Sequence, residues 1–304
     1  MIGILLIMAG LVMGIDVVNL RSYLSNDYAY GDQQTYVTET AIESITFDLD
    51  TRDIVIRHHE SETFIIHYYQ HDKETWTIEE TNGVFYVKQK EDVRQWFFFR
   101  FPAKTYRSIE LYVPHGADLS LLLKTQTGSI KTEFDDPQDY RNVLFESSTG
   151  SITVHKVSAQ KFTAKTQTGS VDLRDIVSVE RIYAQSSTGS VTVKNVTASG
   201  ITIKTDTGSA LLESSQSTES VSVRVSTGDV VVKSTEAPSF DLASSTGDIS
   251  FTALPNVDYS MDLSVSTGSI RVFGDAQGKN YVRTSGDVSI VAKTSTGSIR
   301  IQSS

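Results

Sequence analysis

The stretch from Phe162 to Leu173, FTAKTQTGSVDL, contains the pattern that decides the fold. Apolar residues alternate before the glycine, at Phe162 and Ala164, and again after it, at Val171 and Leu173, as they do in strands with one buried face. The parity of the alternation changes across Gly169. A continuous strand cannot shift phase without turning or bulging, so the sequence predicts a corner at a glycine. Glycine accepts backbone conformations that are costly for a residue with a Cβ atom.

The same pattern recurs with spacings of 19 to 22 residues through Gly268, which is typical of the coils of a solenoid. We therefore predict an all-β fold, a parallel β-solenoid with coils of roughly 20 residues, from about Leu119 to the C-terminus. Each coil should contain a strand, a glycine corner, a second strand and a return loop. The predicted structural corners are Gly128, Gly150, Gly169, Gly189, Gly208, Gly228, Gly247, Gly268 and Gly297, with a Ser-Gly variant at Gly286.

Hydroxyl side chains recur three residues before the corner glycine. We expect them to stack along the solenoid and to donate hydrogen bonds to one another. The members are Thr125, Ser147, Thr166, Ser186 and Thr205, with Val225 in the same place. Near the C-terminus the repeat falters, because only 11 residues separate Gly286 from Gly297. Either Ser285–Asp287 forms a corner on the opposite side of the coil, or the last coil carries an insertion around 273–280.

The chain before the repeats divides into three further parts. Residues 41–118 alternate at period two without the glycine repeat, and we predict a β-rich N-terminal part that caps the solenoid of 119–304. Asn82-Gly83 within it predicts a tight hairpin turn. Residues 21–40 are polar with scattered tyrosines and are interpreted as a tether. Residues 1–20 precede this tether.

The first 15 residues, MIGILLIMAGLVMGI, are almost wholly apolar. They are slightly shorter than the roughly 20 residues that span a bilayer, but they are the only membrane candidate in the chain. We predict that 1–20 form one N-terminal transmembrane helix that anchors the protein in a membrane. A cleaved signal peptide is disfavoured, because no Lys or Arg precedes the apolar run and no small-x-small site follows it. A buried core helix is disfavoured because a solenoid has little room for one at its tip.

Composition excludes several function classes. The chain has 27 basic and 37 acidic residues and a net charge of −10, which would repel a nucleic-acid backbone. It contains no cysteine, and therefore no disulfide or thiolate metal site. No phosphate-binding or dinucleotide motif occurs, and we expect no cofactor. Four histidines, His58, His59, His67 and His71, cluster in the N-terminal strand region. His67 and His71 have a spacing familiar from zinc sites on helices, but their segment is predicted as strand and turn, so we expect solvated histidines and no metal.

The corners follow the pattern [ST]-T-G-[SD]-[IV], and the segment from Ile109 to Ile130, IELYVPHGADLSLLLKTQTGSI, has Pro114 and Gly116 before a leucine run. With the N-terminal apolar segment, these features resemble the bacterial "putative adhesin" family of β-strand-repeat proteins of unknown function, which includes LiaG-type envelope proteins. The resemblance covers roughly 41–304. It implies a surface or envelope module whose body lies outside the cytoplasm, and it carries over no catalytic residue.

Two aspartates are the candidates for an enzyme active site. Asp229 and Asp248 follow the corner glycine in adjacent coils, where stacking would place them about 4.8 Å apart. That is close to the ~5 to 5.5 Å carboxyl separation of retaining glycosidases. The alternative, which we favour, is that Asp, like Ser, binds backbone amides at a turn. No Arg, His or aromatic residue recurs beside the pair to hold a sugar.

Two surfaces are candidates for interaction. Basic residues recur four positions before the corner, at Lys124, Lys165, Lys204, Arg224 and Lys293, with Glu146 interrupting them. This stripe either binds an anionic glycan or other cell-wall polymer, or is a solvated face that discourages lateral pairing of sheets. The second surface is the WFFFRF stretch, in which Trp96 and Phe98 lie on one strand face and Phe97, Phe99 and Phe101 on the other.

The aromatic stretch needs cover on both faces. We favour an internal cap over the first coil, whose core and edge have no preceding neighbour. The alternative is a hairpin tip that touches the bilayer or a partner.

The leading interpretation is a membrane-anchored, single-pass, extracytoplasmic β-solenoid without enzymatic activity, which serves as an interaction or scaffold module of the cell envelope. Its expected partners are the membrane, through 1–20, and a cell-wall polymer or an envelope protein. The runner-up is a carbohydrate-active β-helix enzyme, a polysaccharide hydrolase or lyase, that uses Asp229 and Asp248. A third interpretation is an intracellular scaffold tethered at the membrane.

Overall fold

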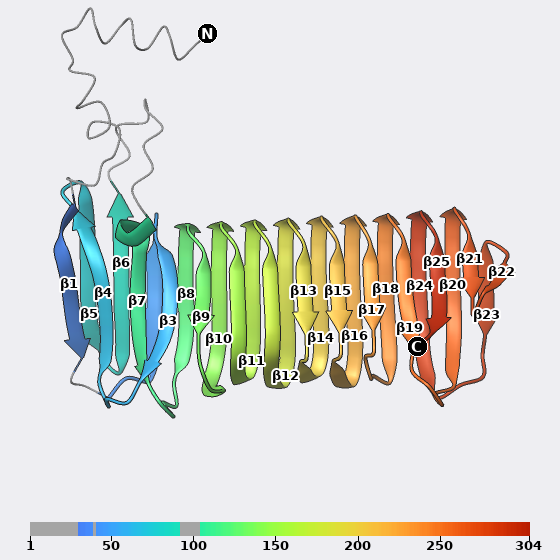
Figure 1. The fold of residues 1–304 in the computed structure, drawn as a ribbon, viewed down its shortest axis with the longest axis horizontal. Helices are drawn as coiled ribbons and strands as arrows, with labels where there is room; N and C mark the ends of the chain where they lie inside the picture. Colours follow the sequence, from blue (N-terminus) through green and yellow to red (C-terminus); the bar gives the residue numbers. More distant parts are fainter. Residues whose placement is uncertain (1–29, 39–40, 92–103) are drawn as a thin grey trace, which may run out of the picture.

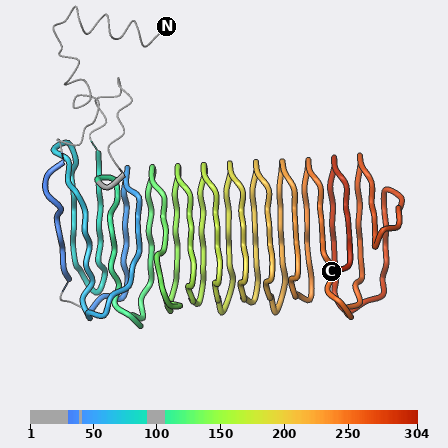
Figure 2. The backbone as a smooth tube through the Cα atoms, in the orientation of Figure 1, coloured from blue at the N-terminus to red at the C-terminus, as the bar shows by residue number. Residues whose placement is uncertain are grey.

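The computed structural model describes residues 30–38, 41–91 and 104–304. Twenty-five strands join in one sheet that winds into a rod of stacked coils (Figures 1 and 2). The predicted all-β class is confirmed: the only helix within these ranges is a short 3₁₀ helix, η2 (Lys104–Arg107). No helix in the described ranges is long and apolar enough to cross a membrane. The predicted anchor, 1–20, lies outside them.

The strands fall into three groups along the rod. The N-terminal group is β1 (Tyr30–Thr38), β2 (Ser44–Leu49), β3 (Asp53–His59), β4 (Phe64–His71), β5 (Glu74–Thr81), β6 (Val84–Glu91) and β7 (Ser108–Pro114). The central group is β8 (Ser120–Thr127), β9 (Ile130–Glu133), β10 (Gln138–Thr149), β11 (Ile152–Thr168), β12 (Val171–Thr188), β13 (Val191–Lys194), β14 (Thr197–Thr207), β15 (Ala210–Glu213), β16 (Gln216–Thr227) and β17 (Val230–Lys233). The C-terminal group is β18 (Ser239–Thr246), β19 (Ile249–Ala253), β20 (Tyr259–Thr267), β21 (Ile270–Val272), β22 (Asp275–Gln277), β23 (Asn280–Arg283), β24 (Val288–Thr296) and β25 (Ile299–Ser303).

One central coil illustrates the repeat. The long strand β12 ends at Thr188, the chain bends at Gly189, and the short strand β13 follows. Both strands pair in parallel with their equivalents in the next coil, so that Thr188 lies beside Thr207 and Val191 beside Ala210. Equivalent residues of successive coils are therefore stacked in columns along the rod, as expected for a parallel solenoid.

The core lies inside the coils and is built from the alternating apolar positions. The residues seven and five before each glycine, and two and four after it, are the ones that face inward. Ile182, Ala184, Val191 and Val193 of the coil at Gly189 are all 0% exposed. The predicted change of parity therefore arises because the chain changes direction at the glycine. The apolar side chains before and after the bend thus face the same core.

The structure places the predicted glycines at the bends between the long and short strands. From Gly150 onward their φ angles lie between 136° and 149°, a region that L side chains rarely adopt. A second constraint was not apparent in the sequence. A Cβ atom on Gly189 would overlap the carbonyl oxygen of Gly169 and lie 2.6 Å from its carbonyl carbon. Successive corners are stacked backbone on backbone, and only glycine leaves room for this.

A second corner lies six residues after the glycine. Its residue adopts the left-handed conformation, with φ between 46° and 58°, although it is never a glycine. Asn and Asp tolerate this conformation better than most residues, because a short polar side chain can bond locally. The residues are Lys156, Asp175, Asn195, Ser214 and Ser234. At Asn195, Ser214 and Ser234 a bend ends the short strand, as predicted for the return loop, whereas β11 and β12 continue as strand through Lys156 and Asp175.

The hydroxyl column is present, but its hydrogen bonds differ from the prediction. The side chains do not donate to one another. Ser186 donates to the carbonyl oxygen of Gly169 at 2.8 Å, and Thr205 to that of Gly189 at 2.8 Å. Each hydroxyl thus satisfies a corner carbonyl of the preceding coil, an acceptor that the bend takes out of the sheet. The same bond is made by Ser147, Thr166, Ser244 and Thr294.

The last coil is out of sequence order. Strands β24 and β25 lie between the coil of β18 and β19 and the coil of β20 and β21, pairing in parallel with both. After the coil at Gly247, the chain leaves one coil position empty and forms the coil at Gly268. Strands β22 and β23 then fold back and pair antiparallel with the outer side of that coil. Finally, β24 and β25 fill the empty position. Both predicted explanations hold in part. Residues 273–280 are an insertion, and the backbone of Gly286 packs against the backbone of Tyr259, away from the Thr-Gly corners.

The N-terminal part continues the rod. β2 and β3 form the first coil, and they pair in parallel with β6 and β7 on the side away from the repeats. Asn82 and Gly83, with φ of 53° and 74°, connect β5 and β6 in the predicted hairpin. Residues 30–38, predicted as part of the tether, instead form β1, which pairs antiparallel with β4. Polar composition concealed this strand, because most of its side chains are exposed.

The glycine corners yield a stability prediction with a matched control. Gly189→Ala should lower the free energy of unfolding by several kcal/mol, because its methyl group meets the backbone of Gly169 as well as an unfavourable φ. Gly116 also has positive φ, at 70°, but has open space around it. Gly116→Ala should therefore cost only about 1 kcal/mol. Urea denaturation of both variants measures the difference. Equal losses would mean that φ alone, and not the stacking, requires glycine.

Candidate functional site

The basic residues of the predicted stripe form one column, here called the basic column, on the outer face of the long strands. Lys124 lies beside Glu146, and Glu146 lies beside Lys165. Farther along the rod the pairs are Gln185 with Lys204, Lys204 with Arg224, Arg224 with Ala243, and Ala243 with Lys293. The structure thus brings together all five predicted basic residues, with other residues between some of them.

The two halves of the basic column differ in charge. In the N-terminal half, Glu146 pairs with Lys124 at 2.8 Å and with Lys165 at 3.6 Å, which neutralises much of this segment. In the C-terminal half, Arg224 pairs with Asp241. Lys204 and Lys293 have no carboxylate partner among the described residues, although the Lys204 ammonium lies 5.6 Å from the centroid of the Tyr183 ring. The two lysines of the basic column without a carboxylate partner therefore both lie in its C-terminal half.

The face is hollowed along this C-terminal half. The basic column forms one wall of the hollow, and the residues two before the glycine form the other. The buried residues three before the glycine lie between them. We call this feature the C-terminal hollow, and its lining includes Lys204, Asp206, Arg224, Ser226, Ala243, Ser245, Ser264, Ser266, Asn280, Lys293 and Ser295.

Asp229 and Asp248 have a structural role at the corners. The Oδ1 atom of Asp229 accepts a hydrogen bond from the backbone N–H of Asp248 at 2.8 Å. Asp248 Oδ1 accepts in turn from the N–H of Ser298 at 2.7 Å. Serines do the same in other coils, as Ser190 does for the N–H of Ser209 at 3.4 Å. The favoured interpretation of the two aspartates, as ligands of backbone amides at a turn, agrees with this geometry.

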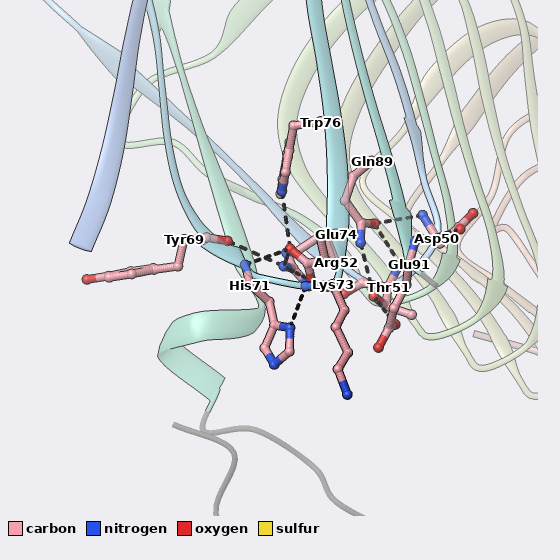
Figure 3. Close-up of polar contacts among 10 residues, drawn as sticks. All are labelled: Asp50, Thr51, Arg52, Tyr69, His71, Lys73, Glu74, Trp76, Gln89 and Glu91. Carbon is pink, nitrogen blue, oxygen red and sulfur yellow. Dashed lines mark hydrogen bonds and ion pairs between the residues drawn. The ribbon is translucent and has the colours of Figure 1, made fainter. Parts of the chain in front are cut away.

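A buried ion pair occupies the N-terminal end of the corner column. Arg52 stands at the corner of the first coil, and Gly128 of the next coil is stacked on its carbonyl group. The Arg52 side chain, 1% exposed, forms an ion pair with Glu74 and donates to the carbonyl oxygen of Thr51 at 2.9 Å. Its guanidinium also lies 5.5 Å from the Trp76 ring centroid. Figure 3 shows this pair at the centre of the polar contacts.

Other side chains complete this end. Glu74 accepts hydrogen bonds from the indole N–H of Trp76 and from the backbone N–H of His71, both at 3.2 Å. Gln89, 0% exposed, accepts from the backbone N–H groups of Asp50 at 3.0 Å and Thr51 at 3.1 Å. These side chains replace the hydrogen-bond partners that a preceding coil would supply. The cluster is therefore a structural cap of the first corner.

The sequence contained a signal for Arg52 that the glycine search missed. Thr51-Arg52-Asp53-Ile54 matches the corner pattern with arginine in place of glycine, and Asp53 Oδ1 accepts from the N–H of Ser129 at 2.7 Å as the other corner residues do. Because no preceding glycine corner is stacked against Arg52, a side chain fits there.

Two of the clustered histidines, His58 and His71, are less solvated than predicted. His71 is buried, at 8% exposed, and its Nδ1 accepts from the N–H of Lys73 at 3.1 Å. His58 is half-buried: its Nε2 lies 3.0 Å from the Tyr140 hydroxyl, and its ring packs against Phe134. Within the described residues, no group of three or more His, Cys, Asp or Glu is arranged to hold a metal ion.

Burial lowers the pKa of His58 to about 4, with smaller contributions from His115 and His59. The His115 ring centroid lies 5.0 Å away. The Nδ1 atom of His58 is buried and has no hydrogen-bond partner among the described residues. A protonated imidazole would leave a charged donor without an acceptor here, so the neutral ring is the form that the fold accommodates.

The predicted aromatic contacts, Trp96 and Phe98, lie outside the described residues, as does the rest of WFFFRF. Their role stays a prediction.

Fold and surface together define a non-globular β-repeat protein: a glycine-cornered parallel solenoid with a columnar outer face. The chain belongs to the Toastrack DUF4097 family, which it matches twice, over residues 42–180 and 161–304. This confirms the family resemblance inferred from the corner pattern. No curated protein matches the chain significantly.

The solved structures that are similar to this chain include two with the following similarities. One, titled a putative adhesin from Bacteroides fragilis NCTC 9343, has 12% identity and a TM-score of 0.47, and the match covers 90% of this chain and 98% of that chain. The other, titled a putative cell adhesion protein from Clostridium sporogenes ATCC 15579, has 8% identity and a TM-score of 0.23, and the match covers 90% of this chain and 99% of that chain.

The cap at Arg52 gives a second stability prediction. Arg52→Met should lower the free energy of unfolding by about 3 to 5 kcal/mol, because it leaves the Glu74 carboxylate buried without its partner. Arg57 is the control: it pairs with Glu110 and Glu133 but is 36% exposed, so Arg57→Met should cost less than about 1 kcal/mol. Combining Arg52→Met with Glu74→Gln should recover much of the loss. Urea denaturation of the two single variants and the double variant measures these changes. If Arg52→Met lowers the free energy of unfolding no more than Arg57→Met does, the cap assignment is contradicted.

His58 gives a pH prediction. Its pKa is lower in the folded state than the usual 6.5, so the unfolded chain binds more protons between about pH 6.5 and 4. The contribution of the neutral His58 ring to the free energy of unfolding is fully present above pH 6.5 and is lost as the pH falls toward 4. Discounted for solvent screening of a half-exposed ring, it should be about 1 kcal/mol. The free energy of unfolding, measured with urea at pH 7 and pH 4.5, should fall less between the two pH values for His58→Gln than for the wild type. An unchanged pH dependence in His58→Gln would contradict this assignment.

Proposed function

We propose that this protein is a non-enzymatic interaction module of the cell envelope, anchored in the membrane by residues 1–20, with the solenoid outside the cytoplasm. The observation that carries the proposal is the basic column with its hollow. Residues stacked at a fixed interval line a long open face, and such a face suits an extended partner better than a small substrate. The resemblance to adhesin-like repeat proteins of the envelope supports a surface role, and the apolar N-terminal sequence supports the anchor.

The absence of enzymatic activity is part of the proposal. Asp229 and Asp248, the candidate catalytic pair, are exposed at the corners, and an oxygen of each carboxylate accepts a backbone N–H. Identical bonds from serine in neighbouring coils explain why an oxygen-bearing side chain occurs there. These backbone contacts favour a structural role for the two aspartates over the polysaccharide hydrolase or lyase alternative.

Location is tested on intact cells that express the full chain with a protease-cleavable epitope tag after Ser304. We expect added protease to remove the tag without lysis, and the chain to sediment with membranes. Deleting residues 1–20 should release it from them. A cytoplasmic marker that stays intact is the control. A tag that is cleaved only after lysis would instead support the tethered intracellular scaffold.

A further inference from the structure

The C-terminal hollow is more specific than a generally basic face. Across its coils the basic column reads Lys204, Arg224, Ala243, Lys293 and Ser264 in spatial order. Coils are stacked about 4.8 Å apart, so one small residue separates Arg224 from Lys293 by roughly 10 Å. The three cations thus extend over roughly 14 Å, from Lys204 to Lys293, with one uncharged position between Arg224 and Lys293.

The facing wall offers hydrogen bonds instead of charge. It consists mainly of serines, and their hydroxyl groups make no hydrogen bond with another described residue. Each can both donate and accept. Asp206 adds one carboxylate acceptor, and Asn280 of the folded-back strand β23 lines the hollow as well. The serines are Ser226, Ser245, Ser266 and Ser295.

We propose that the C-terminal hollow binds a linear acidic polysaccharide, extended along the axis of the solenoid. Its carboxylates would meet Lys204 and Lys293, the two lysines of the hollow without a carboxylate partner among the described residues, and its hydroxyls would meet the serine wall. These two lysines lie three coils apart, roughly 14 Å, so that uncharged parts of the sugar chain would occupy the interval between the two carboxylates.

A densely charged polymer fits this surface less well. Asp206 lies in the wall and Asp241 beside Arg224, and both would repel a polyphosphate or a nucleic acid. The net charge of −10 adds a long-range repulsion of the same sign. A sugar chain with one carboxylate per ring or per disaccharide has polar hydroxyl groups between its charges and tolerates these acidic residues.

This inference deepens the proposed interaction module and rests on it for biological meaning, but it can be tested separately. The full chain, purified in detergent, is titrated with oligogalacturonate by isothermal titration calorimetry, with dextran and polyphosphate as the neutral and dense polyanionic comparisons. We expect oligogalacturonate to bind, more weakly as salt is raised, and to bind more tightly than either comparison polymer.

Lys204→Gln combined with Lys293→Gln should weaken this binding about tenfold, as expected for two lost surface charge contacts. The matched control combines Lys194→Gln and Lys233→Gln, which remove the same charge from the column of the short strands. Its affinity should stay within about twofold of the wild type, and both variants should keep the wild-type melting temperature.

The inference is overturned if oligogalacturonate does not bind, if polyphosphate or dextran binds as tightly, or if the two double variants lose affinity equally. A chain that protease reaches on intact cells but that does not bind refutes only the inference. A chain that binds in vitro but stays protected in intact cells refutes the proposed location and leaves the binding site standing.

Discussion

The rest of the structure depends on the contact between successive corner glycines. Each glycine is so close to the carbonyl group of the one before it that a single methyl group would not fit. This contact fixes how the coils are stacked, and the parallel hydrogen bonds of both flanking strands follow from it. The hydroxyl three residues before the glycine and the Ser or Asp after it then satisfy the polar atoms that the bend exposes. Where the stack begins, arginine replaces glycine, Thr125 still donates to its carbonyl oxygen, and the arginine side chain forms a buried ion pair with Glu74.

Much of the fold was predictable because the coil is a local unit. The inward positions, the corner and the basic column all follow from counting residues relative to one glycine, and the structure places Phe162, Val171 and Lys204 accordingly. The direction of the hydroxyl bonds was not predictable. A periodic Thr or Ser shows that a column exists, but whether it faces other hydroxyls or a carbonyl depends on how the backbone bends.

The order of the last coils could not be read from the sequence for a different reason. β20 and β24 present the same inward pattern, and each could be stacked on β18 equally well by that pattern. Only the long-range pairing of strands determines that β24, and not β20, is stacked on β18. The cap at Arg52 was concealed because its partner, Glu74, is distant in sequence and belongs to no repeat. The charge difference between the two halves of the basic column likewise depends on contacts such as that between Arg224 and Asp241.

The placement of the final strands has a consequence for synthesis on the ribosome. Coils up to Gly247 can be added one after another as the chain emerges. The coil at Gly268 emerges next, but the level between it and the coil at Gly247 belongs to residues 288–303, which are made later. The gap in the rod is therefore closed by a segment that enters between two parts that have already been made. A premature stop after Asp287 would remove an internal level and leave the terminal coil without its parallel partner.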